Sequence, residues 1–173
     1  MSWVIETLLT LAAVLMLRLF VVNVVRIQGG SMLPTLLNRD FALVWRLPYL
    51  FREPRRGDVV ICHYPGRKMK RLPFLPQAFV KRVIGLPGDT LEWVEGELLL
   101  NGTPLAEPYL DPARCRFPRT RPPVTLSPDE YFVLGDNRDS SNDSRRVGPL
   151  RRRAIRGRVV CILFPLKRIR RIR

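Results

Sequence analysis

Apolar residues dominate the start of the chain, and short alternating patterns of apolar and polar residues come after them. Within residues 3–25, the longest run without a charged side chain spans residues 7–17, and Arg18 and Asn23 interrupt the apolar residues beyond it. Such a run is shorter than the roughly 20 residues of a membrane-spanning helix and is typical of a signal-peptide core or a buried helix. However, no basic residue precedes the run and no Ala-x-Ala site comes after it. Glu6 and Arg18 could reach the membrane interface and extend the usable span.

Beyond the apolar segment, the pattern is mostly that of short β-strands separated by turn residues. The predicted strands lie at residues 24–28, 41–45, 58–64, 78–84, 90–94, 97–100, 130–134 and 154–163. Asn101-Gly102 comes after a Leu-rich run and favours a tight hairpin turn, because both residue types tolerate positive φ. The chain has sixteen prolines, and those between residues 104 and 128 exclude a long helix there. We predict a mainly β fold built from coiled antiparallel sheets.

The formal net charge of +15 is concentrated at one end of the chain. From Gly148 onward there are ten Lys or Arg residues and no acidic residue, which accounts for two-thirds of the excess. A terminal basic run is typical of a solvated surface or of a rim that meets anionic lipid. We therefore expect membrane lipid as a partner and no nucleic-acid binding.

Three cysteines, Cys62, Cys115 and Cys161, cannot all pair within the chain. Cys62 and Cys161 lie in apolar strand-like runs, where a cysteine behaves as a small hydrophobic residue. The chain has no Cys-x-x-Cys motif and no Cys/His cluster. We therefore expect no metal site and no cofactor.

One serine is flanked by residues that favour an irregular loop, in which its side chain would be accessible. The sequence directly behind the apolar segment reads Gly29-Gly30-Ser31-Met32-Leu33-Pro34-Thr35. The two glycines permit positive φ and the close approach of another chain, and the proline restricts the backbone on the other side. Most strings of this kind are plain turns. A catalytic role for this serine requires a nearby base that takes its proton.

The usual base, histidine, occurs once in the chain, as His63 at the end of a predicted strand. A lone histidine is more often structural than catalytic, so a Ser-His-Asp triad is not favoured. A lysine can replace histidine if burial lowers its pKa by about three units, at a cost of about 4 kcal/mol. In the predicted strand 78–84, alternation puts Lys81 on the same face as Phe79 and Val83. Lys81 is therefore the candidate base, whereas the other lysines lie in basic segments that we expect to be solvated.

Four sequence boxes in the chain resemble those of one known family. The boxes read Ser31-Met32-Leu33-Pro34-Thr35-Leu36, Arg56-Gly57-Asp58-Val59-Val60, Phe79-Val80-Lys81-Arg82-Val83-Ile84-Gly85-Leu86-Pro87-Gly88-Asp89, and Gly135-Asp136-Asn137-Arg138-Asp139-Ser140-Ser141-Asn142-Asp143-Ser144-Arg145. In order and spacing they resemble the boxes of bacterial type I signal peptidases over about residues 3–164. The resemblance implies a catalytic domain of coiled antiparallel β-sheet with a small inserted β annex, preceded by one uncleaved N-terminal transmembrane helix.

The resemblance also implies catalytic roles. It places the general base on Lys81, which takes the proton of Ser31, and the reaction proceeds through an acyl-enzyme intermediate. The backbone N–H of Ser31 is the natural first donor to the oxyanion. Some members add a Ser or Thr hydroxyl two residues before the nucleophile, but this chain has Gly29 there. Near the serine, the candidate walls of a shallow pocket for Ala-like side chains are Ile27, Met32 and Val80.

The stretch 135–145 is dense in Asp, Asn and Ser, like a calcium-binding loop, but it lacks the central glycine and the terminal glutamate of an EF-hand. The resemblance implies instead that Ser141 hydrogen-bonds and orients the base lysine. It also implies an ion pair between Asp143 and Arg145, with Arg82 as a further candidate member. Asp136 is expected to be structural.

The predicted organisation is an anchor at 1–22, a catalytic domain at 23–94 and 129–166, an annex at 95–128 and a basic tail at 167–173. The resemblance implies a membrane-anchored serine endopeptidase that cleaves signal peptides from exported pre-proteins after a small-x-small motif. It would act as a single-pass protein of the cytoplasmic membrane, with the catalytic domain on the outer face. We also expect a monomer.

Two other functions are compatible with parts of the sequence. One is a different Ser/Lys protease, such as a self-cleaving repressor-type peptidase, but those normally carry a soluble N-terminal portion. The other is a membrane-anchored β module without enzymatic activity, which binds anionic lipid or polymer through the Arg-rich C-terminus. The signal peptidase is favoured over both because several independent boxes occur in order.

Overall fold

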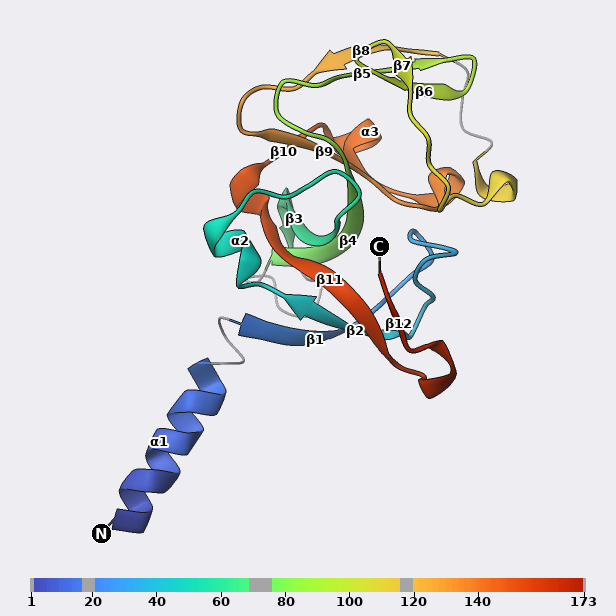
Figure 1. Cartoon of the computed structure of the whole chain (residues 1–173). Coiled ribbons are helices and arrows are strands. Elements are labelled where there is room, and N and C mark those ends of the chain that lie inside the picture. Colours follow the sequence, from blue (N-terminus) through green and yellow to red (C-terminus); the bar gives the residue numbers. More distant parts are fainter. Residues whose placement is uncertain (1, 17–20, 69–75, 116–119, 173) are drawn as a thin grey trace.

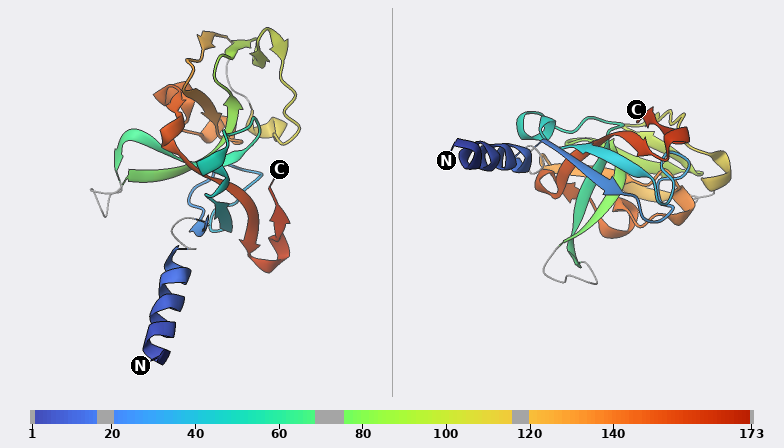
Figure 2. Two further views of the ribbon diagram at one scale, coloured as in Figure 1. Left: turned by 60° about the vertical axis from the view of Figure 1, so that its left-hand side comes forward. Right: turned by 90° about the horizontal axis from the view of Figure 1, so that it is seen from below.

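The computed structural model describes residues 2–16, 21–68, 76–115 and 120–172, and it shows a coiled β body with one helix extending from it (Figure 1). Helix α1 (Ser2–Met16) points away from the body in each view (Figure 2). Among the described residues, no helix has the length and apolar character needed to cross a membrane. The predicted anchor at 1–22 lies partly outside the described residues, and its last residue, Val22, already belongs to the first strand.

Eight strands form the larger sheet, and every neighbouring pair in it is antiparallel. Its main path runs in the order β1-β2-β11-β3-β4-β9-β10, with β12 paired to β11. The strands are β1 (Val22–Arg26), β2 (Phe41–Trp45), β3 (Val59–Lys68), β4 (Pro76–Gly85), β9 (Glu130–Leu134), β10 (Leu150–Arg151), β11 (Ile155–Phe164) and β12 (Arg170–Arg171). The long β3 and β4 form a hairpin that projects from the body (Figure 2).

A second sheet of four strands forms the annex, in the order β7-β6-β5-β8. Its strands are β5 (Thr90–Val94), β6 (Glu97–Leu100), β7 (Thr103–Pro104) and β8 (Arg121–Thr125). The predicted turn at Asn101-Gly102 is confirmed: both residues have positive φ, 51° and 78°, and they join β6 to β7. The annex sheet begins at Thr90, whereas the sequence placed residues 90–94 in the catalytic domain.

The two sheets share a hydrophobic core. Ile84 and Phe132 of the larger sheet pack in one cluster with Leu91, Trp93 and Leu98 of the annex. The ring centroids of Trp93 and Phe132 lie 5.8 Å apart. Because apolar side chains of both sheets are removed from water together, the annex is joined to the catalytic domain by packing and not only by its connections.

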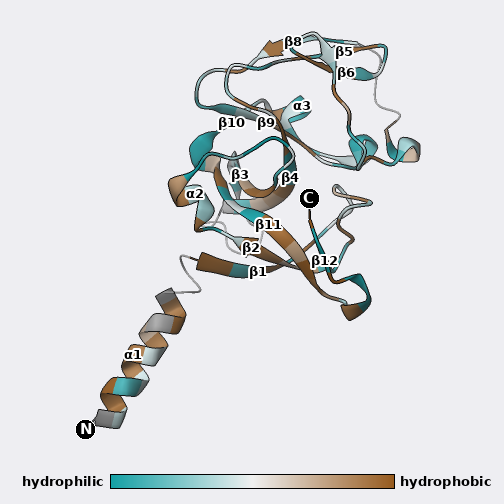
Figure 3. Cartoon of the chain, viewed as in Figure 1, coloured by the Kyte–Doolittle hydropathy of each residue, from teal (hydrophilic) through white to brown (hydrophobic). Residues whose placement is uncertain are grey.

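Helical turns are short and lie at the rim of the sheets. They are α2 (Pro48–Phe51), α3 (Ser144–Val147), η2 (Pro112–Arg114), η3 (Arg138–Ser140), η4 (Arg152–Ala154) and η5 (Leu166–Arg168). By contrast, α1 exposes apolar side chains along most of its length, including Trp3, Leu8 and Leu15. Much of its ribbon has the brown colour of hydrophobic residues in Figure 3.

Candidate active site

The Ser31 loop lies directly after β1 and is held from within. Met32 and Leu36 are buried and anchor the loop in the core, whereas Ser31 is half-buried. The N–H of Leu36 donates to the Met32 carbonyl at 2.8 Å. Gly29 has φ +89°, a conformation that strongly favours glycine. The loop therefore places the serine side chain at the surface of the core, as a displayed group.

The structure brings Ser31 and Lys81 together. Lys81 lies on β4 and is 2% exposed, and its Nζ lies 2.8 Å from Ser31 Oγ and 2.8 Å from the Val80 carbonyl oxygen. Burial lowers the pKa of Lys81, because desolvation disfavours the charged amine. Cys62, Asp143 and Asp136 act in the opposite direction without reversing the shift. A hydroxyl in contact with a desolvated amine is an arrangement suited to proton transfer.

The loop after β9 carries the predicted ion pair. Arg145 Nη2 and Asp143 Oδ2 lie 2.8 Å apart, and both side chains are buried. Asp143 also accepts the N–H of Gly135 at 3.0 Å. Burial raises the pKa of Asp143, but the hydrogen bond and charge of Arg145, together with the contributions of Ser141 and the Gly135 N–H, outweigh it, and the net pKa is lowered. Asp143 is therefore an anion that fixes the two ends of this loop to each other.

Arg82 does not join that pair, contrary to the prediction. Its guanidinium binds Asp136 through two hydrogen bonds, Nε to Oδ1 at 2.9 Å and Nη2 to Oδ2 at 2.7 Å. Asp136 Oδ2 also accepts the hydroxyl of Thr35 at 2.5 Å. The physical reason is strand alternation: Arg82 points to the opposite face of β4 from Lys81, toward Thr35 and not toward Arg145. Asp136 thus ties the strand of the lysine to the loop of the serine.

Asn137 is a site residue that the sequence analysis did not single out. Its backbone N–H donates to the Ser31 carbonyl, and its side-chain Nδ2 donates to the Gly30 carbonyl, both at 3.0 Å. Next to it, Gly135 allows a close approach of the two loops. A Cβ at Gly135 would lie 2.4 Å from the Ser31 carbonyl oxygen. Thr35 and Asn137 both lie inside the boxes, so the boxes were the signal that could have found them.

The predicted hydrogen bond between Ser141 and Lys81 is absent. Ser141 Oγ is buried and, among the described residues, has no hydrogen bond of good geometry, although it lies close enough to Asp143 to help lower the pKa of that carboxylate. It packs against Gly135, where an added Cβ would lie only 2.2 Å from it. Lys81 Nζ has its two contacts with Ser31 and the Val80 carbonyl. Ser141 is thus close to the site without touching the amine.

A groove of about 900 Å³ opens at Ser31 and Lys81. It is lined by Val25, Arg26, Ile27, Gln28, Gly29, Ser31, Met32, Ile61, Gln77, Ala78, Phe79, Val80 and Lys81. A smaller hollow of about 310 Å³ shares three of these walls and contains His63. Burial, Arg156 and Arg46 lower the pKa of His63. His63 lines the hollow and is not among the groove residues beside the serine.

Residues 1–164 match the family model described as signal peptidase, peptidase S26. The chain is 39% identical over 162 residues to signal peptidase I of Leptolyngbya laminosa, which covers 93% of this chain and 78% of that protein. It is 33% identical over 177 residues to signal peptidase I P of Bacillus subtilis subsp. natto, and the match covers 98% of this chain and 91% of that protein. A crystal structure of a signal peptidase I from Enterococcus faecalis V583 matches with 31% identity and a TM-score of 0.49, and the match covers 62% of this chain and 97% of that one.

The sequence matches and the mainly β body define the class of protein, a serine peptidase and therefore a hydrolase. More particularly, the chain belongs to the signal peptidase family, peptidase S26. The family assignment from the four boxes is thereby confirmed.

Proposed function

We propose that the chain cleaves signal peptides from exported pre-proteins with Ser31 as nucleophile and Lys81 as general base. The observation that carries this proposal is the 2.8 Å contact between Ser31 Oγ and an amine that is almost fully buried. Burial keeps water from Lys81 and lowers its pKa, so the neutral amine is available as a base. Signal-peptide cleavage is also the activity to which the family name refers.

In the proposed reaction, Ser31 Oγ attacks the scissile carbonyl carbon while Lys81 Nζ takes the hydroxyl proton. The tetrahedral oxyanion collapses, the C–N bond breaks, and Lys81 gives the proton to the leaving amine. A water molecule then gives a proton to the same amine and attacks the acyl carbon. The ester C–O bond breaks, and Lys81 returns the proton to Ser31 Oγ as the acid product leaves. Asp143, Arg145 and Ser141 act as supporting residues that hold the loop beside the amine.

The Ser31 backbone N–H is the proposed first donor to the oxyanion. Gly29 has no side chain, so a second donor must be a backbone N–H or a bound water. The space beside Gly29 is open: apart from the glycine and its two chain neighbours, no heavy atom of the described residues lies within 4 Å of where a Gly29 Cβ would be.

The open edge of β4 supports a substrate bound as an extended strand. Residues 78–81 pair with β3 on one side, and the pairing of β4 with β9 begins at Arg82. Their other edge faces the groove, where a peptide could add backbone hydrogen bonds. Ile27, Met32 and Val80 are apolar walls beside Ser31, and we propose that they leave room only for small side chains.

We also propose that the N-terminal 22 residues attach the enzyme to the cytoplasmic membrane, with the catalytic domain on the outer face. The exposed apolar side chains of α1 support this proposal, because burying them in lipid removes apolar surface from water. The serine lies shortly after the first strand, so it would act near the bilayer surface. All residues of the proposed site belong to one chain, so a monomer suffices.

Substrate specificity tests the proposed function. The full chain in detergent is expected to cut a labelled pre-protein directly after its small-x-small motif, as read by N-terminal sequencing of the product. Val80→Phe is expected to narrow the groove and lower kcat/KM at least about tenfold for Ala before the cut, with a smaller loss for Gly. The matched control is Val147→Phe, because Val147 is exposed and does not line the groove. Cleavage at unrelated positions, or equal losses for Ala and Gly, would contradict the proposed pocket.

The pH dependence of activity reports the charge of Lys81. The neutral amine is the active form, so kcat/KM is expected to rise with pH through a pKa below the ordinary 10.5 and then to level off. The same shift has a consequence for stability. Between the lowered pKa and 10.5 the unfolded chain binds more protons than the folded chain, so the free energy of unfolding rises with pH there. A rate profile whose only limb lies near 10.5 would falsify the neutral-lysine mechanism.

A further inference from the structure

A segment of the annex lies against the loop that carries Asp136 and Asp143. Glu107, between β7 and η2, binds Arg138 at two points: Nη1 to Oε2 at 2.8 Å and Nη2 to Oε1 at 2.5 Å. The exposed fractions of the two side chains are 6% for Arg138 and 8% for Glu107. The hydroxyl of Tyr109 donates to Glu107 Oε1 at 2.6 Å. A bidentate pair this well shielded from water holds its two segments in one geometry.

Arg138 passes this restraint on to the active site. Its Nε donates to the Gly135 carbonyl at 3.1 Å, and its own carbonyl accepts Arg145 Nη2 at 2.8 Å. Gly135 packs against the carbonyl of Ser31, and Arg145 pairs with Asp143. The annex glutamate is thus linked through a single arginine to both ends of the loop beside the serine.

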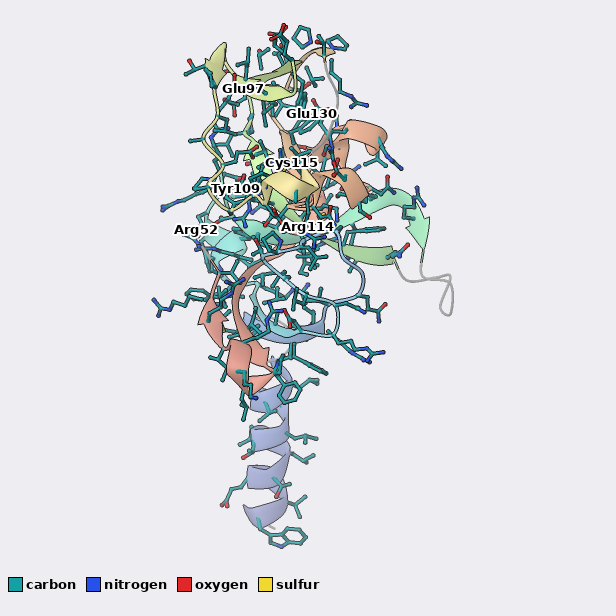
Figure 4. The ribbon with its side chains drawn as sticks, turned by 90° about the vertical axis from the view of Figure 1, so that its right-hand side faces the viewer. Arg52, Glu97, Tyr109, Arg114, Cys115 and Glu130 are labelled. Carbon is teal, nitrogen blue, oxygen red and sulfur yellow. The ribbon has the colours of Figure 1, made fainter. Side chains whose placement is uncertain are left out.

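Tyr109 makes a second link. The guanidinium carbon of Arg82 lies 3.9 Å from the centroid of the Tyr109 ring, in the geometry of a cation–π contact. Arg82 in turn holds Asp136, and it is the residue directly after Lys81 on β4. In Figure 4, Glu97 lies toward the far end of the annex, and Tyr109 lies nearer to the catalytic domain.

We infer that Glu107 and Tyr109 are positioning residues, with which the annex holds the catalytic loop against Lys81 and keeps water from its amine. The inference rests on the proposed function, because it assigns to the annex a part in the Ser31–Lys81 chemistry. The hydrogen bonds of the Lys81 amine go to Ser31 and to the Val80 carbonyl, and neither annex residue takes part in them. Their effect is transmitted through Arg138 and Arg82.

The inference predicts a change in a titration and not only a loss of activity. If the loop is released, water reaches Lys81 and its pKa returns toward the ordinary value, so less of the amine is neutral at pH 7. The groups whose charge acts on Lys81 are Cys62 from β3 and Asp136, Asp143 and Arg145 from the loop. Substituting residues of the annex leaves all of them in the chain.

Tyr109 itself does not titrate in the assay range. Burial, together with the neighbouring Glu107 carboxylate, raises the pKa of Tyr109 far above its ordinary value. Its hydroxyl therefore keeps its proton, and a shifted limb of the rate profile cannot be attributed to this group.

The test compares kcat/KM from pH 6 to 11 for the full chain and its Glu107→Gln, Tyr109→Leu and Tyr109→Phe variants. We expect Glu107→Gln and Tyr109→Leu to lower kcat/KM at pH 7 by about 10- to 100-fold and to move the acid limb to higher pH. Tyr109→Phe keeps the ring over Arg82 and is expected to lose less. Glu97→Gln is the matched control, because Glu97 is an exposed annex carboxylate, and its profile should equal that of the wild type.

Thermal unfolding of each variant, measured with the same samples, separates positioning from folding. If Glu107→Gln does not fold, Glu107→Asp is substituted, since it keeps the charge and shortens the reach. The inference is overturned if the acid limb of the rate profile does not move in the folded Glu107 and Tyr109 variants. It is also overturned if the loss of kcat/KM in a variant is no larger than its unfolded fraction explains. If the wild type has no limb below 10.5, or if Ser31→Ala is active, the proposed function fails first and the inference fails with it.

Discussion

Ser31→Ala and Lys81→Ala are each expected to lower pre-protein cleavage by roughly 10⁴-fold or more. In the proposed mechanism the first change removes the attacking oxygen and the second removes the group that accepts its proton, so either one stops the same step. The double variant should be no worse than the single variants, because the two groups act as one unit. The measurement is the rate of cleavage of a labelled pre-protein in detergent, under single-turnover conditions.

Ser127→Ala and Lys167→Ala are the matched controls for the dyad, since both residues are exposed and lie outside the groove. Both are expected to cleave at the wild-type rate. If Ser31→Ala and Lys81→Ala kept full activity while Arg→Gln changes in the C-terminal tail abolished function, the non-enzymatic lipid-binding module would be the better explanation. Retained folding of the two inactive variants should be checked by circular dichroism.

Asp136→Ala is expected to destabilise the fold by about 3–5 kcal/mol, because it leaves the guanidinium of Arg82 buried without its carboxylate. The two side chains are each 1% exposed and lie 2.7 Å apart. The same change removes the acceptor of the Thr35 hydroxyl, so the loop of the serine loses the tie to β4 that runs through Asp136. Only the longer contact from Arg82 Nη2 to Thr35 Oγ1, at 3.4 Å, remains there. Urea unfolding should show a lower midpoint with an unchanged m-value.

Asp111→Asn is the matched control for the buried pair. Asp111 and Arg114 also form an ion pair, but their side chains are 35% and 44% exposed. An exposed pair contributes at most about 1 kcal/mol, so this variant should unfold close to the wild type. If Asp136→Ala does not fold, Asp136→Asn keeps the size of the side chain and removes only its charge. A loss below about 1 kcal/mol in either Asp136 variant would show that the pair does not secure the loop.

Much of the fold could be predicted from local sequence pattern. The strands at 41–45, 90–94, 97–100 and 130–134 have the predicted bounds, and the Asn101-Gly102 turn is where the residues require it. These features depend on alternation and on backbone preferences within a few residues. Strand β8 escaped prediction because Pro122 and Pro123 argue against a strand. It lies at the edge of the annex sheet, where a missing N–H is tolerated.

Local sequence pattern predicted the candidate site only in part. The sequence identified Ser31 and Lys81 as candidates by their neighbours, and alternation placed Lys81 on the face of Phe79 and Val83. It could not assign the partner of Arg82, because Asp136 and Asp143 lie in one loop and both are far from Arg82 along the chain. The contact of Asp136 with both Arg82 and Thr35 decided that choice.

The sequence by itself determined which side chains can do the chemistry: a displayed serine, a lysine on an apolar strand face, and a loop rich in carboxylates. Only the tertiary structure decided which of them meet, that Ser141 misses the amine, and that Glu107 of the annex pairs with Arg138 of the loop. The physical reason is the separation along the chain of the residues that interact. Strand patterns arise from neighbouring residues, whereas contacts across 31 to 101 positions depend on how the sheets coil and pack.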